Sequence, residues 1–194
     1  VLPTGAANSG EVEDYVVTTT AYDFGDLPDT GAGVGSGNYE TLLANNGPRH
    51  AIINSLRIGA LVDAEANGVN SLATGDDATG TDDEDGVSNL SGLAQGQTTN
   101  VVVTVTNNTG VNATLWSWID FNANGTVDAG ESVTNTIVSA AASTNVTNSF
   151  SVPVGAASST YARFRVGTNA AEVVLPTGPA SSGEVEDYVV TTTA

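Results

Sequence analysis

The second half of the chain alternates hydrophobic and polar residues with a period of two, which is the pattern of half-buried β-strands. The clearest run is 100–106 (NVVVTVT), in which Val101, Val103 and Val105 share one face. Gly, Pro, Asn or Ser bound each run, as expected of strands joined by turns. The other predicted strands are 114–120, 132–138, 145–152, 160–166 and 184–192. Short strands at this spacing predict an all-β protein with an immunoglobulin-like antiparallel β-sandwich.

Residues 22–97 lack this alternation and are rich in Gly and Asp. Within them, only 39–45 and 51–60 have a pattern that could form a helical turn or a short helix. A polar stretch of this length rarely stays ordered without an organising centre. We therefore divide the chain into a loop-rich acidic part, 22–97, which we expect calcium to organise, and a β-sandwich part, 98–194.

The chain nearly repeats its beginning at its end. Residues 1–21 read VLPTGAANSGEVEDYVVTTTA and residues 174–194 read VLPTGPASSGEVEDYVVTTTA. Such near-identity is typical of tandem arrays, whose units mainly contact their neighbours. We interpret 1–21 as the terminal strand of a preceding repeat or as a donor strand, and 22–194 as one repeat. A duplication within one closed domain is the alternative.

The first copy has no obvious domain of its own, so it could complete the sheet of a neighbouring copy by strand addition. This interpretation predicts a homopolymer of repeats or subunits. The residues predicted to make the assembly contact are Glu11, Val12, Glu13, Asp14, Tyr15, Val16 and Val17.

Charge restricts the partners. The chain has 22 acidic residues against four basic ones, all of them arginine, and a formal net charge of −18. This charge argues against binding to nucleic acid or to an anionic membrane, since both need a cationic surface. It favours a bound cation, and Ca²⁺ is the predicted cofactor, because dense carboxylates repel each other unless they are neutralised. The chain has no cysteine and no apolar run long enough to span a membrane, so disulfides and direct membrane insertion are not expected.

The segment 120–131 (DFNANGTVDAGE) has the oxygen spacing of a twelve-residue calcium loop, with Gly at the sixth place and Glu at the twelfth. The preceding WSWI string predicts a strand, so we expect an EF-hand-like loop between strands rather than between helices. An Asp/Asn/Gly-rich hairpin turn would use the same residue types, but it would not need the final Glu. The predicted ligands are Asp120, Asn122, Asn124, the Thr126 carbonyl, Asp128 and Glu131.

A second acidic cluster lies at 76–85 and would either be a solvated loop or contribute to another metal site. On the final predicted strand, Glu184 and Glu186 point to one face and the residues that alternate with them point to the other. Burying two unpaired carboxylates is costly, so either Arg163 and Arg165 or calcium must neutralise them. The possible second metal site consists of Asp76, Asp77, Asp82, Asp83, Asp85, Glu184 and Glu186.

Several motifs resemble those of bacterial GEVED-domain proteins, and they occur in the same order. They are DFGDLPD, GPRH, VDAE, ATGDDATGTDDEDGV, WIDFNANG, YARFRV and the terminal GEVEDY. The resemblance spans nearly all of 22–192 and implies an extracellular, β-rich repeat module of secreted or surface proteins, stabilised by calcium and with no established enzymatic activity. One departure is Asn124, which stands where related loops commonly place Asp. The signature residues are Glu184, Glu186, Asp187 and Tyr188, with copies at Glu11, Glu13, Asp14 and Tyr15.

The chain does not carry the residues of a common catalytic centre. His50 is its only histidine, so any histidine-based general base must use it, and no Gly-x-Ser-x-Gly string is present. Aromatic residues are scarce, and we predict that Trp116 and Trp118, which share a strand face, fill the core or a repeat junction. We therefore expect no enzyme. One hypothesis is a calcium-stabilised extracellular bacterial fibre or stalk, and the other is a calcium-dependent adhesin module that binds a glycan or protein ligand.

Overall fold

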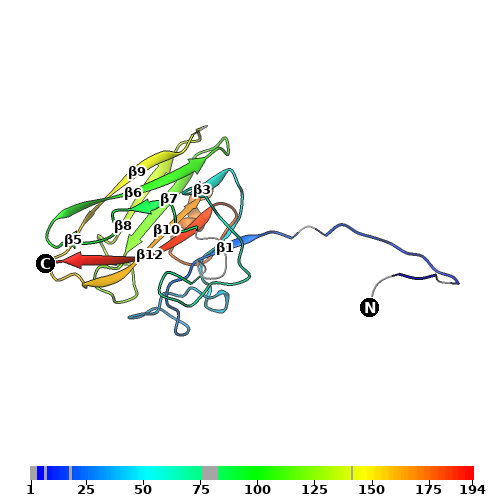
Figure 1. The fold of residues 1–194 in the computed structure, drawn as a ribbon, viewed down its shortest axis with the longest axis horizontal. Helices are drawn as coiled ribbons and strands as arrows, with labels where there is room; N and C mark the ends of the chain where they lie inside the picture. The colour runs from blue at the N-terminus through cyan, green and yellow to red at the C-terminus, as the bar shows by residue number, and fades with distance from the viewer. Residues whose placement is uncertain (1–3, 7, 18, 76–82, 141) are drawn as a thin grey trace.

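The computed structural model describes residues 4–6, 8–17, 19–75, 83–140 and 142–194. This part of the chain is nearly all β, with two larger sheets that enclose one hydrophobic core and a third, small sheet. Figure 1 shows the N-terminal segment leaving the body near β1 (Tyr22–Phe24) as an extended chain. The predicted all-β fold is therefore confirmed, and the paired sheets fit a sandwich.

The first large sheet has the order β5-β12-β10-β7-β8. Its strands β12, β10, β7 and β8 pair antiparallel, whereas β5 pairs with the end of β12 in parallel. Because β12 joins the sheet between β10 and β5, the last segment of the chain lies inside this sheet. The bounds are β5 Leu93–Ala94, β7 Ala113–Ile119, β8 Ser132–Ile137, β10 Ser159–Gly167 and β12 Glu184–Thr193.

The second large sheet is built around β6. This strand pairs with β9 along one edge and with β3 and β4 along the other, in each case antiparallel. The bounds are β3 Leu56–Ile58, β4 Val87–Ser88, β6 Thr98–Asn107 and β9 Thr144–Ser151. The small sheet has the order β1-β2-β11, with β2 at Arg49–Ala51 and β11 at Pro179–Ala180.

The core follows from the alternation along the strands. Val101, Val103 and Val105 of β6 are fully buried. Leu115 and Ile119 of β7, in the other large sheet, belong to the same core cluster. Each fully buried side chain of this size contributes about 1.5–3 kcal/mol relative to an exposed one. Stability therefore comes mainly from the alternating positions that the sequence pattern identified.

All six predicted strands are present, each within two residues of the predicted limits. The segment 39–45 contains a short 3₁₀ helix, η1 (Leu43–Asn45), and α1 (Ala170–Val173) is a single turn. The prediction of a helix in 51–60 is wrong, because this segment contains β3. Leu56 and Ile58 are fully buried on either side of Arg57, which is the pattern of a strand. In the described residues, no helix is long and apolar enough to cross a membrane.

Candidate functional site

The GEVEDY sequence forms the first half of β12, and this half is almost completely buried. Glu184, Val185, Glu186 and Asp187 are each at most 2% exposed. The predicted parity holds, because Glu184 and Glu186 lie on the face of β12 that also carries Val190 of the core. The three carboxyl groups among these residues need partners on both faces of the strand.

On the outer face, Asp187 forms a buried ion pair with Arg163 of β10. The guanidinium donates from Nε to Oδ1 and from Nη2 to Oδ2, both at 2.7 Å. Oδ2 also accepts the backbone N–H groups of Asp26 at 2.8 Å and Leu27 at 3.2 Å. A Cβ added at Gly25 would lie 2.4 Å from the same oxygen, so only glycine fits there. Asp187 therefore attaches the DFGDLPD loop to the five-stranded sheet.

Arg165 lies next to this pair and is fully buried. Its Nε donates to Nε2 of His50 at 2.9 Å, and the His50 Nδ1 lies 3.0 Å from the carbonyl of Ser182, which assigns the ring proton to Nδ1. Burial, and then the charge of Arg165, lower the pKa of His50 well below its usual value. Burial also lowers the pKa of Arg165 to about 9. Its Nη atoms donate to the carbonyls of Leu175 (2.5 Å), Thr177 (2.8 Å) and Gly178 (2.8 Å).

On the inner face, Glu184 accepts a hydrogen bond from a backbone N–H, and Glu186 accepts one from a backbone N–H and one from a hydroxyl. Oε2 of Glu184 accepts the backbone N–H of Ile58, and its buried Oε1 has no hydrogen-bond partner among the residues that the structure describes. Glu186 accepts the N–H of Gly86 at 3.0 Å and the hydroxyl of Tyr188 at 3.1 Å. Burial raises the pKa of both glutamates well above the usual value, and the charge of Glu186 raises that of Glu184 further.

The expectation that arginine could neutralise these glutamates is wrong. In the register of β10 and β12, Arg163 lies opposite Asp187 and Arg165 opposite Val185, so both arginines are on the outer face. The glutamates face the other way, towards the β3 and 83–86 segments. Their charges are therefore not balanced by the arginines of the neighbouring strand.

Only part of the possible second metal site can be placed. Asp83 is buried, whereas Asp85 is exposed and accepts the N–H of Ala60 at 2.7 Å. The sequence prediction left out Asp23, which is 3% exposed and accepts the N–H of Val185 at 2.6 Å, directly beside Glu184. No local sequence pattern connects Asp23 to this site, because its partner Val185 lies 162 residues away in the sequence. The remaining predicted ligands, Asp76, Asp77 and Asp82, lie outside the described residues.

The predicted calcium loop, 120–131, connects β7 to β8, so it lies between strands as expected. Its first and last ligands, Asp120 and Glu131, are 4% and 5% exposed. Glu131 reaches back to the start of the loop and accepts the N–H groups of Phe121 and Asp128, both at 2.8 Å. Burial raises the pKa of Glu131 above its usual value.

Side chains in the middle of this loop bond to each other. The amide Nδ2 atoms of Asn122 and Asn124 donate to Oδ2 of Asp128, at 2.8 Å and 2.9 Å. The amide oxygen of Asn124 accepts the N–H of Thr126 at 2.7 Å. Gly125, at the sixth place, has a φ of +81°, as the sharp turn requires.

These residues fit calcium in kind, because every predicted ligand presents an oxygen and hard oxygen donors suit Ca²⁺. In the part of the chain that the structure describes, no three acidic or histidine side chains are already arranged around a common point as a metal site would need. The amide groups of Asn122 and Asn124 would have to turn their oxygens, rather than their nitrogens, towards the cation. Asp120, Asp128 and Glu131 would then supply the negative charge.

The two tryptophans are stacked on the outer face of β7, with ring centroids 5.8 Å apart and an interplanar angle of 11°. Leu115 and Ile119 take the core positions of this strand instead. The prediction that Trp116 and Trp118 share a face is thus confirmed. Neither belongs to the hydrophobic core cluster, and the alternative that they fill a repeat junction stays a prediction. Trp118 is 4% exposed and Trp116 is half-buried.

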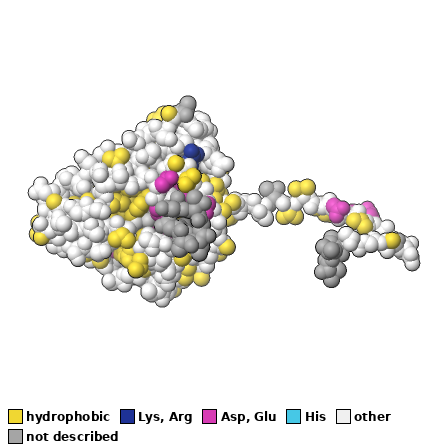
Figure 2. Space-filling model, in the orientation of Figure 1, with side chains coloured by type: hydrophobic (Ala, Val, Ile, Leu, Met, Phe, Trp, Pro, Cys, Tyr) yellow, Lys and Arg dark blue, Asp and Glu magenta, His cyan; other side chains and the backbone are white. Residues whose placement is uncertain are grey.

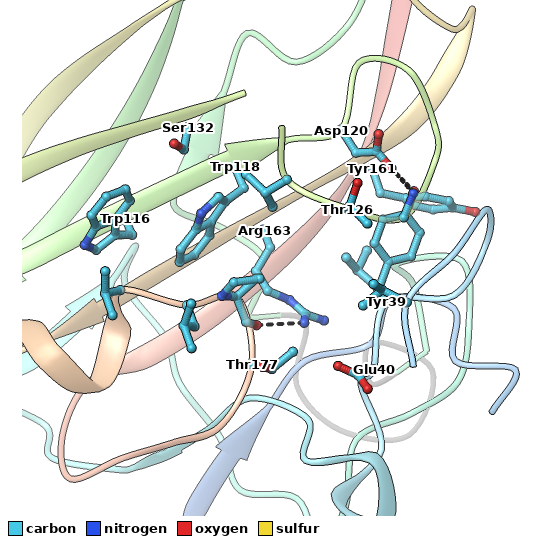
Figure 3. Close-up of a pocket in the computed structure, with 17 residues that line it drawn as sticks. Tyr39, Glu40, Trp116, Trp118, Asp120, Thr126, Ser132, Tyr161, Arg163 and Thr177 are labelled. Atoms are coloured by element: carbon cyan, nitrogen blue, oxygen red, sulfur yellow. Dashed lines mark hydrogen bonds between the residues drawn. The ribbon is translucent and has the colours of Figure 1, made fainter. Parts of the chain in front are cut away.

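Both tryptophans line a pocket of about 460 Å³ between the 120–131 loop and the 174–177 segment (Figure 3). Tyr39 lies at the other end of this pocket, where its ring packs edge-on against Tyr161. The Tyr39 hydroxyl donates to Oδ2 of Asp120 at 2.8 Å, so the predicted calcium loop forms one wall. Sequence analysis did not find Tyr39, since it lies in a stretch without strand periodicity.

The first copy of the GEVEDY sequence has a very different environment from the second. Val12, Tyr15, Val16 and Val17 are between 78% and 97% exposed, and the described residues of this segment form no strand. Figure 2 shows hydrophobic and acidic side chains along the extended N-terminal segment. The seven predicted assembly residues therefore contact no sheet of their own chain.

The fold and the buried acidic strand define an all-β module of the sandwich type, closed by a final strand that carries GEVEDY. The family model of the GEVED domain matches residues 114–191, so this region of the chain is similar to a GEVED domain. The match includes the predicted calcium loop and the GEVEDY residues of β12, but not the first copy of this motif at 11–15. A search of curated proteins found none that matches this chain.

Proposed function

We propose that the chain is a structural, non-catalytic unit of a calcium-stabilised extracellular fibre or stalk on a bacterial surface. Units would join head to tail, through residues 11–17 of one unit in the β12 position of another. The observation that carries this proposal is that one sequence has two environments. Val190 is fully buried, and its copy Val17 is 80% exposed. Val185 is 2% exposed, and its copy Val12 is 83% exposed.

The physical argument rests on the identity of the two copies over GEVEDYVVTTTA. A segment with this sequence can make every contact that β12 makes, including the apolar burial that stabilises the strand. Left in water, its exposed valines and tyrosine lose this stabilisation, so a partner sheet is favoured. The partner contact arises either between consecutive units of one polypeptide or between subunits that exchange a strand.

Two further observations support a structural role. Both ring nitrogens of His50 are engaged and its side chain is fully buried, which leaves it poorly placed as a general base. The 120–131 loop joins two strands and contacts Tyr39 of the N-terminal part. Calcium bound in this loop would therefore stiffen the connection between distant parts of one unit.

Electron microscopy of the native material, with and without a calcium chelator, tests the proposal. We expect filaments whose repeat matches one unit, and chelation should loosen them. Isolated globular particles would refute the polymer. For strand exchange, Val17→Asp should abolish assembly, because Val190 at the same position of β12 is fully buried. Val16→Asp is the matched control and should be tolerated, because Val189 is 40% exposed.

A second candidate function is a calcium-dependent adhesin module. It is favoured by the pocket that Trp116 and Trp118 line, whose size is typical of small-ligand sites. Its wall includes Asp120, so calcium in the loop would fix the shape of the pocket. We expect binding on a glycan array that is lost in Trp116→Ala and after chelation. No binding by the unmodified protein to glycans or surface proteins would count against this function.

A further inference from the structure

The inner face of β12 concentrates buried negative charge at one end of the sandwich. Glu184 is 0% and Glu186 is 1% exposed. Asp23, at 3%, accepts the N–H of Val185, which lies between them. Asp83, at 4%, belongs to the segment whose Gly86 N–H donates to Glu186. Four carboxyl groups thus approach the same half of one strand.

The donors found on this face do not balance that charge. Glu184 accepts one backbone N–H through Oε2, and in the described part of the chain its other oxygen, Oε1, is buried without a hydrogen-bond partner. An unsatisfied buried oxygen costs about 1–3 kcal/mol, and more when the group is charged. Neutralisation by Arg163 and Arg165 is ruled out, because both lie on the opposite face. Either a proton, which the raised pKa values of Glu184 and Glu186 favour, or a bound cation must therefore neutralise this face. The buried Oε1 of Glu184 offers a cation an available oxygen ligand.

We propose that Glu184 and Glu186 bind a second divalent cation of the calcium type, with Asp83 and Asp23 completing its oxygen ligands. Carboxylate oxygens at irregular positions suit Ca²⁺, which accepts six to eight oxygen ligands in flexible geometry. The N–H groups of Ile58 and Gly86 orient the two glutamates, as outer-shell donors do in metal sites. The carboxylates converge when the cation binds, since three of them do not yet surround one point in the described residues.

This cation deepens the calcium stabilisation proposed above and shares no ligand with the 120–131 loop. It would connect the beginning of β12 to β1 through Asp23 and to the 83–86 segment through Asp83. In this site, the two glutamates of the GEVED signature act as metal ligands, while the aspartate of the signature acts through Arg163.

Isothermal titration of the whole chain with CaCl₂ at neutral pH, after treatment with a chelator, tests the proposal. We expect two ions per chain, and one ion in both Glu184→Gln and Glu131→Gln, which remove different sites. Glu11→Gln is the matched control, because Glu11 is the exposed copy of Glu184, and it should keep two ions. Fewer than two ions in the unmodified chain overturns the proposal if Glu184→Gln leaves that number unchanged.

Thermal unfolding gives a second readout with a sign that a merely structural glutamate would not produce. In chelator, Glu184→Gln should unfold at the same or a higher temperature than the unmodified chain, because a neutral amide replaces a carboxyl group that is costly to bury without a cation. In calcium, it should unfold at a lower temperature. A variant that is less stable in both conditions by the same amount refutes a ligand role.

If Glu184→Gln does not fold, terbium luminescence provides an independent measurement. The hydroxyl of Tyr188 lies 3.1 Å from Glu186 Oε2, so its ring would sensitise terbium in this site. Tyr188→Phe should lose that part of the emission and still bind two ions, whereas unchanged emission contradicts the site. These binding measurements do not depend on assembly. A chain that binds two ions without forming fibres would therefore refute the fibre proposal and leave the metal site intact.

Discussion

The ion pair between Asp187 and Arg163 gives the sharpest test of how the GEVED strand holds the fold together. In Asp187→Ala, the guanidinium of Arg163, a residue that is 3% exposed in the unmodified chain, loses two hydrogen bonds of 2.7 Å. Removing one partner of such a buried pair destabilises a protein by about 3–5 kcal/mol. The N–H groups of Asp26 and Leu27 also lose their acceptor, so we expect the upper half of this range.

The chain provides its own control for this experiment. Asp14 occupies the same position in the first copy and is exposed, so Asp14→Ala should change the free energy of unfolding by about 0.5 kcal/mol or less. Urea unfolding followed by circular dichroism, at a concentration where the chain is monomeric, measures both variants. For a chain of this length, the loss at Asp187 corresponds to a decrease of about 8–20 °C in Tm.

A double variant separates the two contributions. Asp187→Ala with Arg163→Met replaces the uncompensated cation by an apolar side chain, so it should recover part of the loss. The part that is not recovered belongs to the backbone N–H groups of the DFGDLPD loop. Equal costs for Asp187→Ala and Asp14→Ala would refute the reasoning, because the two positions differ only in their environment.

Three further predictions follow from the contacts around the site. The pKa of His50 in the folded chain is below its unfolded value near 6.5, so its contribution to stability is complete above that value and is lost as the pH falls. Urea unfolding at pH 7.5 and at pH 5.5 should therefore show a larger decrease in the free energy of unfolding for the unmodified chain than for His50→Gln. Chelation should make the 120–131 loop sensitive to protease, and Glu131→Gln should be sensitive even in calcium; resistance that chelation leaves unchanged would contradict a stiffening role. Gly125→Ala should destabilise the fold by more than about 1–2 kcal/mol, because the strain of a positive φ is joined by a clash between the added Cβ and a backbone carbonyl oxygen 1.7 Å away. Gly130→Ala is the control for strain alone, because Gly130 has a φ of +91° and open space around it. Thermal unfolding measures both variants.

The strands could be predicted from the sequence because alternation and turn residues agree with each other. Val101, Val103 and Val105 leave little choice about which face of their strand is buried. The helix predicted in 51–60 failed for the opposite reason, since only Leu56 and Ile58 mark the strand there and three residues are too few to show a period. Pairing with β6, rather than local propensity, decides the structure of this segment.

The site was harder to predict because it depends on register. The sequence gives the parity of Glu184 and Glu186, but it does not say which residue of β10 lies opposite Asp187. That pairing places Arg163 and Arg165 on the outer face and leaves the glutamates without them. Asp23 and His50 reach the site through contacts with residues more than 130 positions away, and no short-range pattern carries such information.

The long sequence separation between β12 and its partners has a consequence for the order of folding. Asp187 is needed by Asp26 and Leu27, which are synthesised 161 and 160 residues earlier, and such distant contacts make folding slow. Asp14, by contrast, precedes Asp26 by 26 − 14 = 12 residues and has the same neighbours in sequence. During synthesis the first copy can therefore reach these partners before β12 exists. Where the first copy has occupied the position of β12, the final strand must displace an almost identical competitor to complete the sheet, so the timing of synthesis helps to decide which copy each unit keeps.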